Sequence, residues 1–199
     1  MSTERIIVDS KIADEFVKKF ADKARNLPLG DPRKPEPVVL GSVIGMSTVE
    51  HCNALIDDAL AKGAKLVCGG QAESTLMPAT LLDRVTPSMR IYREETFGPV
   101  KCIVRVDGVE AAVDCANDNE YGLSAAVFGR DIGRALNVAR RIESGICHVN
   151  GPTVHDEAQM PFGGVKGSGM GRFGGRAGVA EFTELRWITV QTGPRHYPF

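Results

Sequence analysis

The sequence predicts an α/β fold with a mostly parallel sheet, helices on both faces and a further strand near the C-terminus. Short strand-like runs alternate along the chain with amphipathic helical segments. These runs are almost wholly apolar, which is typical of a parallel sheet covered on both sides. The composition, 43% apolar and 25% charged over 199 residues, is that of one ordinary globular domain.

The first part of the chain predicts a strand, a helix and an irregular connection. Residues 6–8 are apolar and extended in character, and residues 11–25 follow as a helix. Ile12 and Phe16 begin an apolar stripe with a spacing of four, so this helix is expected to lie on a core. Residues 27–41 contain four prolines and are expected to form a surface connection.

A capping box predicts the start of the second helix. Ser47 and Glu50 have the spacing at which each side chain satisfies an amide at a helix start. The helix is expected to run to about Lys62 and to end at Gly63, followed by a short strand within residues 64–70.

The pattern then repeats to residue 150. The predicted segments are strands at 78–82 and 99–106, a helix at 109–118, a strand at 124–129, a helix at 132–142 and a strand at 146–150. Helices that alternate with short apolar strands indicate parallel strands joined by helical crossovers.

A glycine-rich loop follows, and it contains a deceptive motif. Gly169, Gly171 and Gly174 match the G-x-G-x-x-G pattern of dinucleotide-binding loops. No buried strand precedes them, and the nearest acidic residues come too early. We therefore interpret these glycines as turn and close-packing positions.

Residues 186–191 alternate in character like a strand, with Trp187, Thr189 and Gln191 on one side. A strand outside the alternating core needs an edge to pair with. A second subunit or the chain's own sheet could provide that edge, and the pattern alone favours neither.

Charge and targeting signals exclude several partner classes. The 24 basic and 25 acidic side chains give a net charge of -1 without a basic block, so neither nucleic acid nor a membrane surface is an expected partner. No apolar run is long enough to span a bilayer and no secretory signal is present, so a cytoplasmic location is expected.

The cysteine and histidine spacings predict neither a metal site nor a nucleophile. Five cysteines without a C-x-x-C motif are interpreted as small buried side chains. Cys147 and His148 are adjacent on a predicted strand, so their side chains point to opposite faces. Residues 155–157 carry metal-capable groups but no partner cluster, and no metal is assigned.

An acidic pair offers a possible ligand site. Glu94 and Glu95 precede Phe97 and a buried strand. A carboxylate there could accept both hydroxyls of a ribose while the aromatic ring borders a flat heterocycle. A solvated acidic pair beside a turn is the alternative, and the pattern alone favours it.

Four ordered motifs resemble the C-terminal half of NAD(P)-dependent aldehyde dehydrogenases, and the resemblance covers essentially the whole chain. The motifs are "EETFGPV" (94–100), "NDNEYGLSAAVFGRD" (117–131), "GICHVN" (145–150) and "PFGGVKGSGMGRFGG" (161–175). Residues 150–164 and 181–190 look most like the branch that acts on aromatic aldehydes such as salicylaldehyde, benzaldehyde or vanillin.

The resemblance implies roles for individual residues. It implies that Glu95 binds the nicotinamide ribose and that Phe97 lies beside the nicotinamide ring, which reverses the preference for a solvated pair. Phe162, with Val154 and His155 in the preceding loop, is implied to line the substrate tunnel. The implied reaction is oxidation of an aldehyde to the carboxylic acid with NAD or NADP, through a nucleophilic cysteine and a general-base glutamate.

Neither the nucleophilic cysteine nor the general-base glutamate is found in its motif, and both are expected upstream of Met1. The same is expected of the Rossmann cofactor domain. Residues 1–183 are then a catalytic-domain segment, and residues 184–199 an oligomerisation strand and tail. We expect the chain alone to bind NAD or NADP poorly and to be inactive. The alternative is a non-catalytic interaction module that forms homo-oligomers through residues 186–191.

Overall fold

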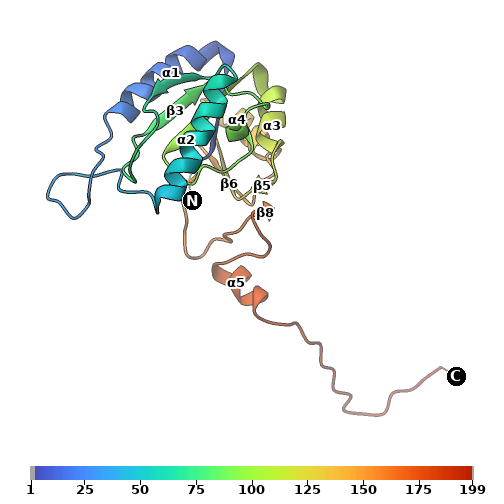
Figure 1. Cartoon of the computed structure of the whole chain (residues 1–199). Coiled ribbons are helices and arrows are strands. Elements are labelled where there is room, and N and C mark those ends of the chain that lie inside the picture. Colours follow the sequence, from blue (N-terminus) through green and yellow to red (C-terminus); the bar gives the residue numbers. More distant parts are fainter. Residues whose placement is uncertain (1–2, 199) are drawn as a thin grey trace.

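The computed structural model describes residues 3–198 and has an α/β architecture (Figure 1). The helices are α1 (Ser10–Arg25), α2 (Met46–Ala61), α3 (Gly108–Asn117), α4 (Ile132–Ala139) and α5 (Gly175–Glu181), with one 3-10 turn, η1 (Arg90–Tyr92). The strands are β1 (Arg5–Asp9), β2 (Lys65–Cys68), β3 (Thr80–Asp83), β4 (Val100–Val106), β5 (Tyr121–Gly122), β6 (Ser124–Val127), β7 (Ile146–Val149) and β8 (Val165–Lys166). None of the helices within 3–198 combines the length and the apolar character needed to cross a bilayer.

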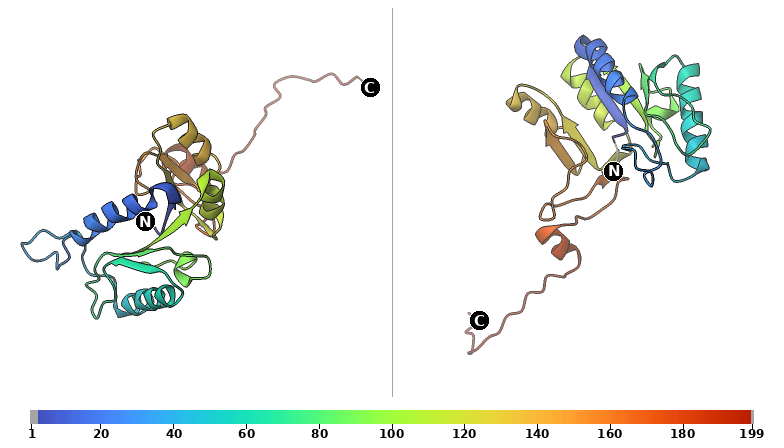
Figure 2. Two further views of the ribbon diagram at one scale, coloured as in Figure 1. Left: turned by 90° about the horizontal axis from the view of Figure 1, so that it is seen from above. Right: turned by 90° about the vertical axis from the view of Figure 1, so that its left-hand side faces the viewer.

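The main sheet has four strands in the order β1-β4-β3-β2. β1 and β3 are both parallel to β4, and β2 is antiparallel to β3 at the edge. Helix α1 packs on one face and α2 on the other (Figures 1 and 2). The prediction of a mostly parallel sheet with helices on both faces is confirmed.

The larger core lies between α2 and the sheet. Leu55 and Ile56 of α2 pack with Leu82 of β3 and with Val100 and Cys102 of β4, and all five side chains are almost fully buried. Apolar burial of this kind stabilises each such side chain by roughly 1.5–3 kcal/mol relative to an exposed position. The predicted alternation of strands and helices therefore produces a continuous apolar core between α2 and the sheet.

The helix starts differ from the predictions in one case. The Asp9 side chain caps α1 by accepting from the Lys11 amide at 3.0 Å. The predicted capping box at Ser47 is wrong, because α2 begins at Met46 after Gly45 and has no side-chain cap. Ser47 already lies inside the first turn of the helix, where its hydroxyl is not at the capping position.

The buried face of α1 is offset by one residue from the predicted stripe. Ala13, Val17, Ala21 and Ala24 are buried, whereas Ile12 is 59% exposed. Small side chains let the helix approach the sheet closely, so the larger residues sit at its margins. The segment is a helix on a core, as predicted, but Ile12 does not belong to its buried stripe.

A second, smaller sheet stands beside the first (Figure 2). It consists of β6 and β7, which are parallel, with α4 packed against both strands. A separate pair, β5 and β8, is antiparallel. Cys147 and His148 are neighbours on β7, so their side chains alternate across it, as predicted.

The glycine loop makes turns, in agreement with its sequence interpretation. Gly169, Gly171 and Gly174 all have positive φ, and β8 before them is a two-residue strand at the surface. At Gly174, a Cβ would lie 2.2 Å from the Met160 carbonyl oxygen, so this position excludes any side chain.

The C-terminal residues do not form a strand in this chain. After α5 the backbone runs extended and away from the body, as Figures 1 and 2 both show. Trp187 is 90% exposed and Val190 is 80% exposed. The option that residues 186–191 are an edge strand of the chain's own sheet is wrong, because no sheet edge within residues 3–198 pairs with them. Pairing with a second subunit remains a prediction.

Candidate functional site

The loop between η1 and β4 is anchored by one buried polar residue. Thr96 is fully buried, and its hydroxyl donates to Glu4 Oε2 at 2.8 Å. The Thr96 amide donates to the same oxygen at 3.2 Å. The Lys101 ammonium lies 3.4 Å from the other oxygen of Glu4, so the partly buried carboxylate is compensated by a positive charge.

Helix α2 holds the same loop from the opposite side. The Cys52 thiol donates to the Thr96 carbonyl at 3.3 Å, and His51 Nε2 lies 2.9 Å from the Glu95 carbonyl oxygen. At Gly98 a Cβ would come within 2.7 Å of Cys52 Sγ, so only glycine allows this close approach. The loop backbone is therefore fixed on both sides.

This anchoring presents Glu95 and Phe97 to solvent on either side of Thr96. Phe97 is 71% exposed and has a φ of 51°, a conformation that bulky residues rarely adopt. Backbone strain of this kind is often found at functional sites, where the surrounding structure holds it in place.

The two acidic residues of this loop have different surroundings. Glu94 pairs with Arg90 at 2.7 Å, and the hydrogen bonds from that guanidinium lower the pKa of the Glu94 carboxyl. The Glu95 carboxylate makes no hydrogen bond or ion pair within residues 3–198. It is therefore the carboxylate of the pair that is available to a ligand.

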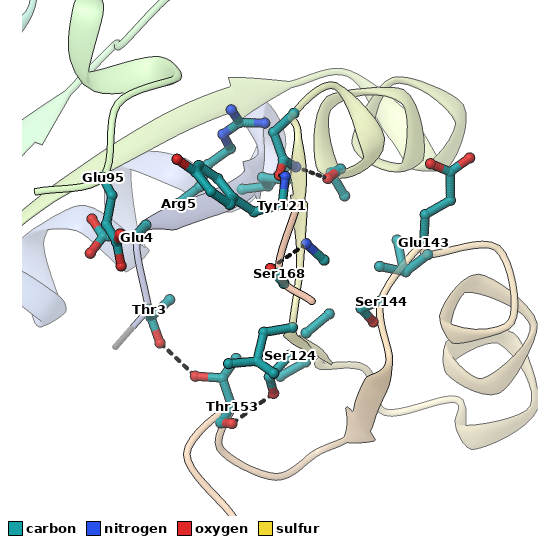
Figure 3. A pocket seen from close by; sticks show the side chains of 18 of the residues that line it. Thr3, Glu4, Arg5, Glu95, Tyr121, Ser124, Glu143, Ser144, Thr153 and Ser168 are labelled. Atoms are coloured by element: carbon teal, nitrogen blue, oxygen red, sulfur yellow. Dashed lines mark hydrogen bonds between the residues drawn. The ribbon is translucent and has the colours of Figure 1, made fainter. Parts of the chain in front are cut away.

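A cavity of about 350 Å³ lies beside this loop, between the two sheets (Figure 3). Its walls come from the start of the chain, Glu94 and Glu95, strand β6 and the loop after β7. The Thr3 and Thr153 hydroxyls lie 2.6 Å apart, and Ser124 Oγ donates to the Thr153 carbonyl at 2.7 Å. These bonds tie the start of the chain and the loop after β7 together at one end of the cavity.

The structure brings only one of the predicted site residues into the cavity wall. Glu95 lines the cavity, whereas Phe97, Val154, His155 and Phe162 do not. Val154 and His155 are exposed, and His155 Nε2 lies 3.3 Å from a Glu157 oxygen. Phe162 is half-buried and bridges to Phe173 across the glycine loop. The predicted substrate-lining residues therefore lie on an exposed surface of this chain.

The contact between Arg5 and Tyr92 in the cavity wall was not predicted from the sequence. Arg5 stacks over the Tyr92 ring, 3.9 Å from its centroid, and donates to the Cys115 carbonyl at 2.6 Å. Burial raises the pKa of the Tyr92 hydroxyl. Arg5 and Tyr92 lie far apart in the sequence, and no local pattern links them.

None of the five cysteines lines the cavity. Burial raises the pKa of Cys52, Cys68 and Cys147, and it raises the pKa of Cys102 to about 12. Reactive thiols need a lowered pKa and access to substrate. The described residues also contain no group of three or more side chains that could hold a metal ion.

Comparison with known proteins decides the family. The family described as "Aldehyde dehydrogenase family" matches residues 1–188. The chain belongs to the aldehyde dehydrogenase family. A vanillin dehydrogenase of Pseudomonas fluorescens is 62% identical over 198 residues, which cover 100% of this chain and 41% of that protein.

Solved structures of this family have the same fold. A salicylaldehyde dehydrogenase from Pseudomonas putida G7, complexed with salicylaldehyde, matches with a TM-score of 0.95 and 52% identity, covering 100% of this chain and 41% of that one. An aldehyde dehydrogenase from Mycobacterium tuberculosis, complexed with NAD+, matches with a TM-score of 0.89 and 31% identity, covering 98% and 41%. The chain therefore spans about two fifths of the length of these relatives. Its predicted place in their C-terminal half remains a prediction.

Proposed function

We propose that the protein containing this chain oxidises an aromatic aldehyde to the carboxylic acid with NAD or NADP. The observation that carries the proposal is the free Glu95 carboxylate beside the exposed Phe97 on a loop anchored from both sides. Relatives named vanillin and salicylaldehyde dehydrogenase support the aromatic substrate class.

Glu95 and Phe97 fit a nicotinamide nucleotide. The two oxygens of a carboxylate can accept hydrogen bonds from both hydroxyls of a ribose, and an aromatic ring provides an apolar boundary for a flat heterocycle. When bound, the nucleotide supplies the acceptor for the hydride that the aldehyde loses. The contribution of this chain is to orient the ribose through Glu95 and to shield the ring through Phe97.

The loop after β7 is proposed to form part of the substrate entrance. Val154 is 56% exposed, and Phe162 presents part of an aromatic ring. In this proposal, Val154, His155 and Phe162 become tunnel walls when the rest of the protein covers them. Apolar and aromatic walls favour a ring over a short aliphatic chain because more apolar surface is removed from water.

The substrate preference gives a direct test. In the full-length protein we expect kcat/KM for vanillin, salicylaldehyde or benzaldehyde to exceed that for acetaldehyde by at least about tenfold, because the ring buries several more carbon atoms. The measurement is the initial rate of NADH formation at several concentrations of each aldehyde. An equal or higher kcat/KM for acetaldehyde would contradict the aromatic assignment.

A second role is proposed for residues 186–191, which we assign to pairing with a second subunit. The exposed Trp187, Ile188 and Val190 support it, because apolar side chains projecting from an extended backbone are typical of segments that bind another chain.

Deletion of residues 187–199 tests the pairing. We expect the shortened full-length protein to lose its association and to elute with the mass of a monomer, measured by size-exclusion chromatography with light scattering. The replacement Thr192→Ala is the control, and it should leave the mass unchanged. An unaltered oligomer after the deletion would exclude this segment as the contact.

A further inference from the structure

Two adjacent residues before β1 contact both of the loops to which ligand roles are assigned above. The Thr3 hydroxyl lies 2.6 Å from the Thr153 hydroxyl, in the loop after β7. The Glu4 carboxylate accepts from the Thr96 hydroxyl at 2.8 Å and from the Thr96 amide at 3.2 Å, in the loop between η1 and β4. Figure 3 shows Thr3 bonded to Thr153, and Glu4 on the side of Glu95. One short segment therefore joins the two loops.

The contact with Glu4 holds the residues on both sides of Phe97. Thr96 is fully buried, and its hydroxyl oxygen lies 3.4 Å from the donating Gly98 amide. The Lys101 ammonium donates to the same hydroxyl at 3.3 Å and to Glu4 at 3.4 Å, so charged groups strengthen the cluster. This cluster keeps Phe97 at its positive φ of 51°, which the backbone does not favour by itself.

The contact with Thr3 holds the root of the loop after β7. Thr153 is half-buried, whereas residues 154–161 are all exposed. The Thr153 carbonyl accepts from Ser124 Oγ at 2.7 Å, so its backbone is fixed to β6 while its side chain is fixed to Thr3. Val154 and His155 follow directly, and their place is therefore set by these two bonds.

We propose that Thr3 and Glu4 are positioning residues that place the loop of the nucleotide and the loop of the aldehyde relative to each other. The inference rests on the function proposed above, in which a hydride passes directly between the two ligands and both must be held in a fixed geometry. Neither residue is assigned a contact with a ligand. Glu4 acts through Thr96, and Thr3 acts through Thr153.

Replacement of Thr96 tests the contact with Glu4. Thr96→Val in the full-length protein keeps the shape of the side chain but removes its hydroxyl. We expect the KM for NAD or NADP to rise by about three- to tenfold, while the KM for the aldehyde stays within about twofold. Thr96→Ser keeps the hydroxyl and should retain the original KM. Glu4→Gln is the second variant, because it removes the charge without adding a buried methyl group, and it should change the constants in the same direction.

Replacement of Thr3 tests the other contact and should give the opposite pattern. We expect Thr3→Val to raise the KM for benzaldehyde by about three- to tenfold and to leave the KM for the nucleotide within about twofold. Thr3→Ser keeps the hydroxyl and is the control. Steady-state kinetics with each substrate varied in turn measure both constants, and melting temperatures report the effect of each variant on the fold.

The separation of the two constants is what distinguishes positioning from general damage. Equal increases of both constants in the valine variants would overturn the proposal, and so would unchanged constants in Thr3→Val and Glu4→Gln. Glu95→Gln separates this inference from the proposed function. If Glu95→Gln raises the KM for the nucleotide but Thr96→Val and Glu4→Gln do not, only the positioning role fails. If Glu95→Gln has no effect, the proposed nucleotide site fails, and the inference fails with it.

Discussion

Glu95→Gln in the full-length protein is expected to lower kcat/KM for NAD or NADP by about 10- to 100-fold. The substitution keeps the size of the side chain but removes the charge that strengthens its bonds to the ribose hydroxyls, and bonds to charged groups have this magnitude. The change should appear mainly as a higher KM for the nucleotide, while the KM for the aldehyde changes little. Steady-state kinetics with varied nucleotide measure both.

Glu94→Gln is the matched control for Glu95→Gln. Glu94 is adjacent in sequence, but its carboxylate is already bonded to Arg90 through two donors. We expect its KM for the nucleotide to stay within about twofold of the unmodified protein, as for a surface ion pair. Similar losses in both variants would show that general damage to the loop, and not ribose binding, explains the result.

Asp83→Ala is expected to lower the free energy of unfolding of this chain by about 3 kcal/mol. Asp83 is 3% exposed and accepts two hydrogen bonds from Arg105, at 3.0 and 2.7 Å. Removing Asp83 takes away the buried partner of Arg105 and leaves the exposed Asp14 as its remaining acidic contact. Loss of one member of a buried pair is the costly case. Urea unfolding followed by circular dichroism gives the change in midpoint at constant slope.

Asp14, the exposed partner of Arg105, allows the effect of an exposed carboxylate on the free energy of unfolding to be compared with that of Asp83. Asp14 also contacts Arg105, at 2.7 Å, but its side chain is 88% exposed. Asp14→Ala should therefore leave the free energy of unfolding nearly unchanged, because water replaces an exposed partner. If Asp83→Ala is equally mild, the buried pair does not stabilise the fold in the way proposed here.

Most of the fold could be predicted from local patterns. The apolar runs at 78–82 and 99–106 became β3 and β4, and the helical periods at 109–118 and 132–142 became α3 and α4. Those patterns indicate which side of a helix or strand faces the core, and in the structure these sides carry the buried residues. The start of α2 was misjudged because the Ser47 motif is compatible with a helix that has already begun one residue earlier.

The C-terminal segment shows where a local pattern is insufficient. Residues 186–191 have the alternation of a strand, but a strand exists only when another edge bonds to it, and the pattern does not name that edge. The site was only partly predictable for a similar reason. Glu95 was predicted from its motif and lines the cavity, whereas Arg5 and Tyr92 meet through tertiary contacts between segments far apart in sequence.

The most direct measurement is NADH formation by residues 1–199 alone, with benzaldehyde and NAD at high concentration. We expect this chain to contribute Glu95 to a cofactor site but to contain no reacting thiol, because its cysteines lie outside the cavity and most of them have raised pKa values. We therefore expect no NADH formation above the rate of a no-protein control. Steady NADH formation that iodoacetamide abolishes would contradict this expectation and place the nucleophile among these five cysteines.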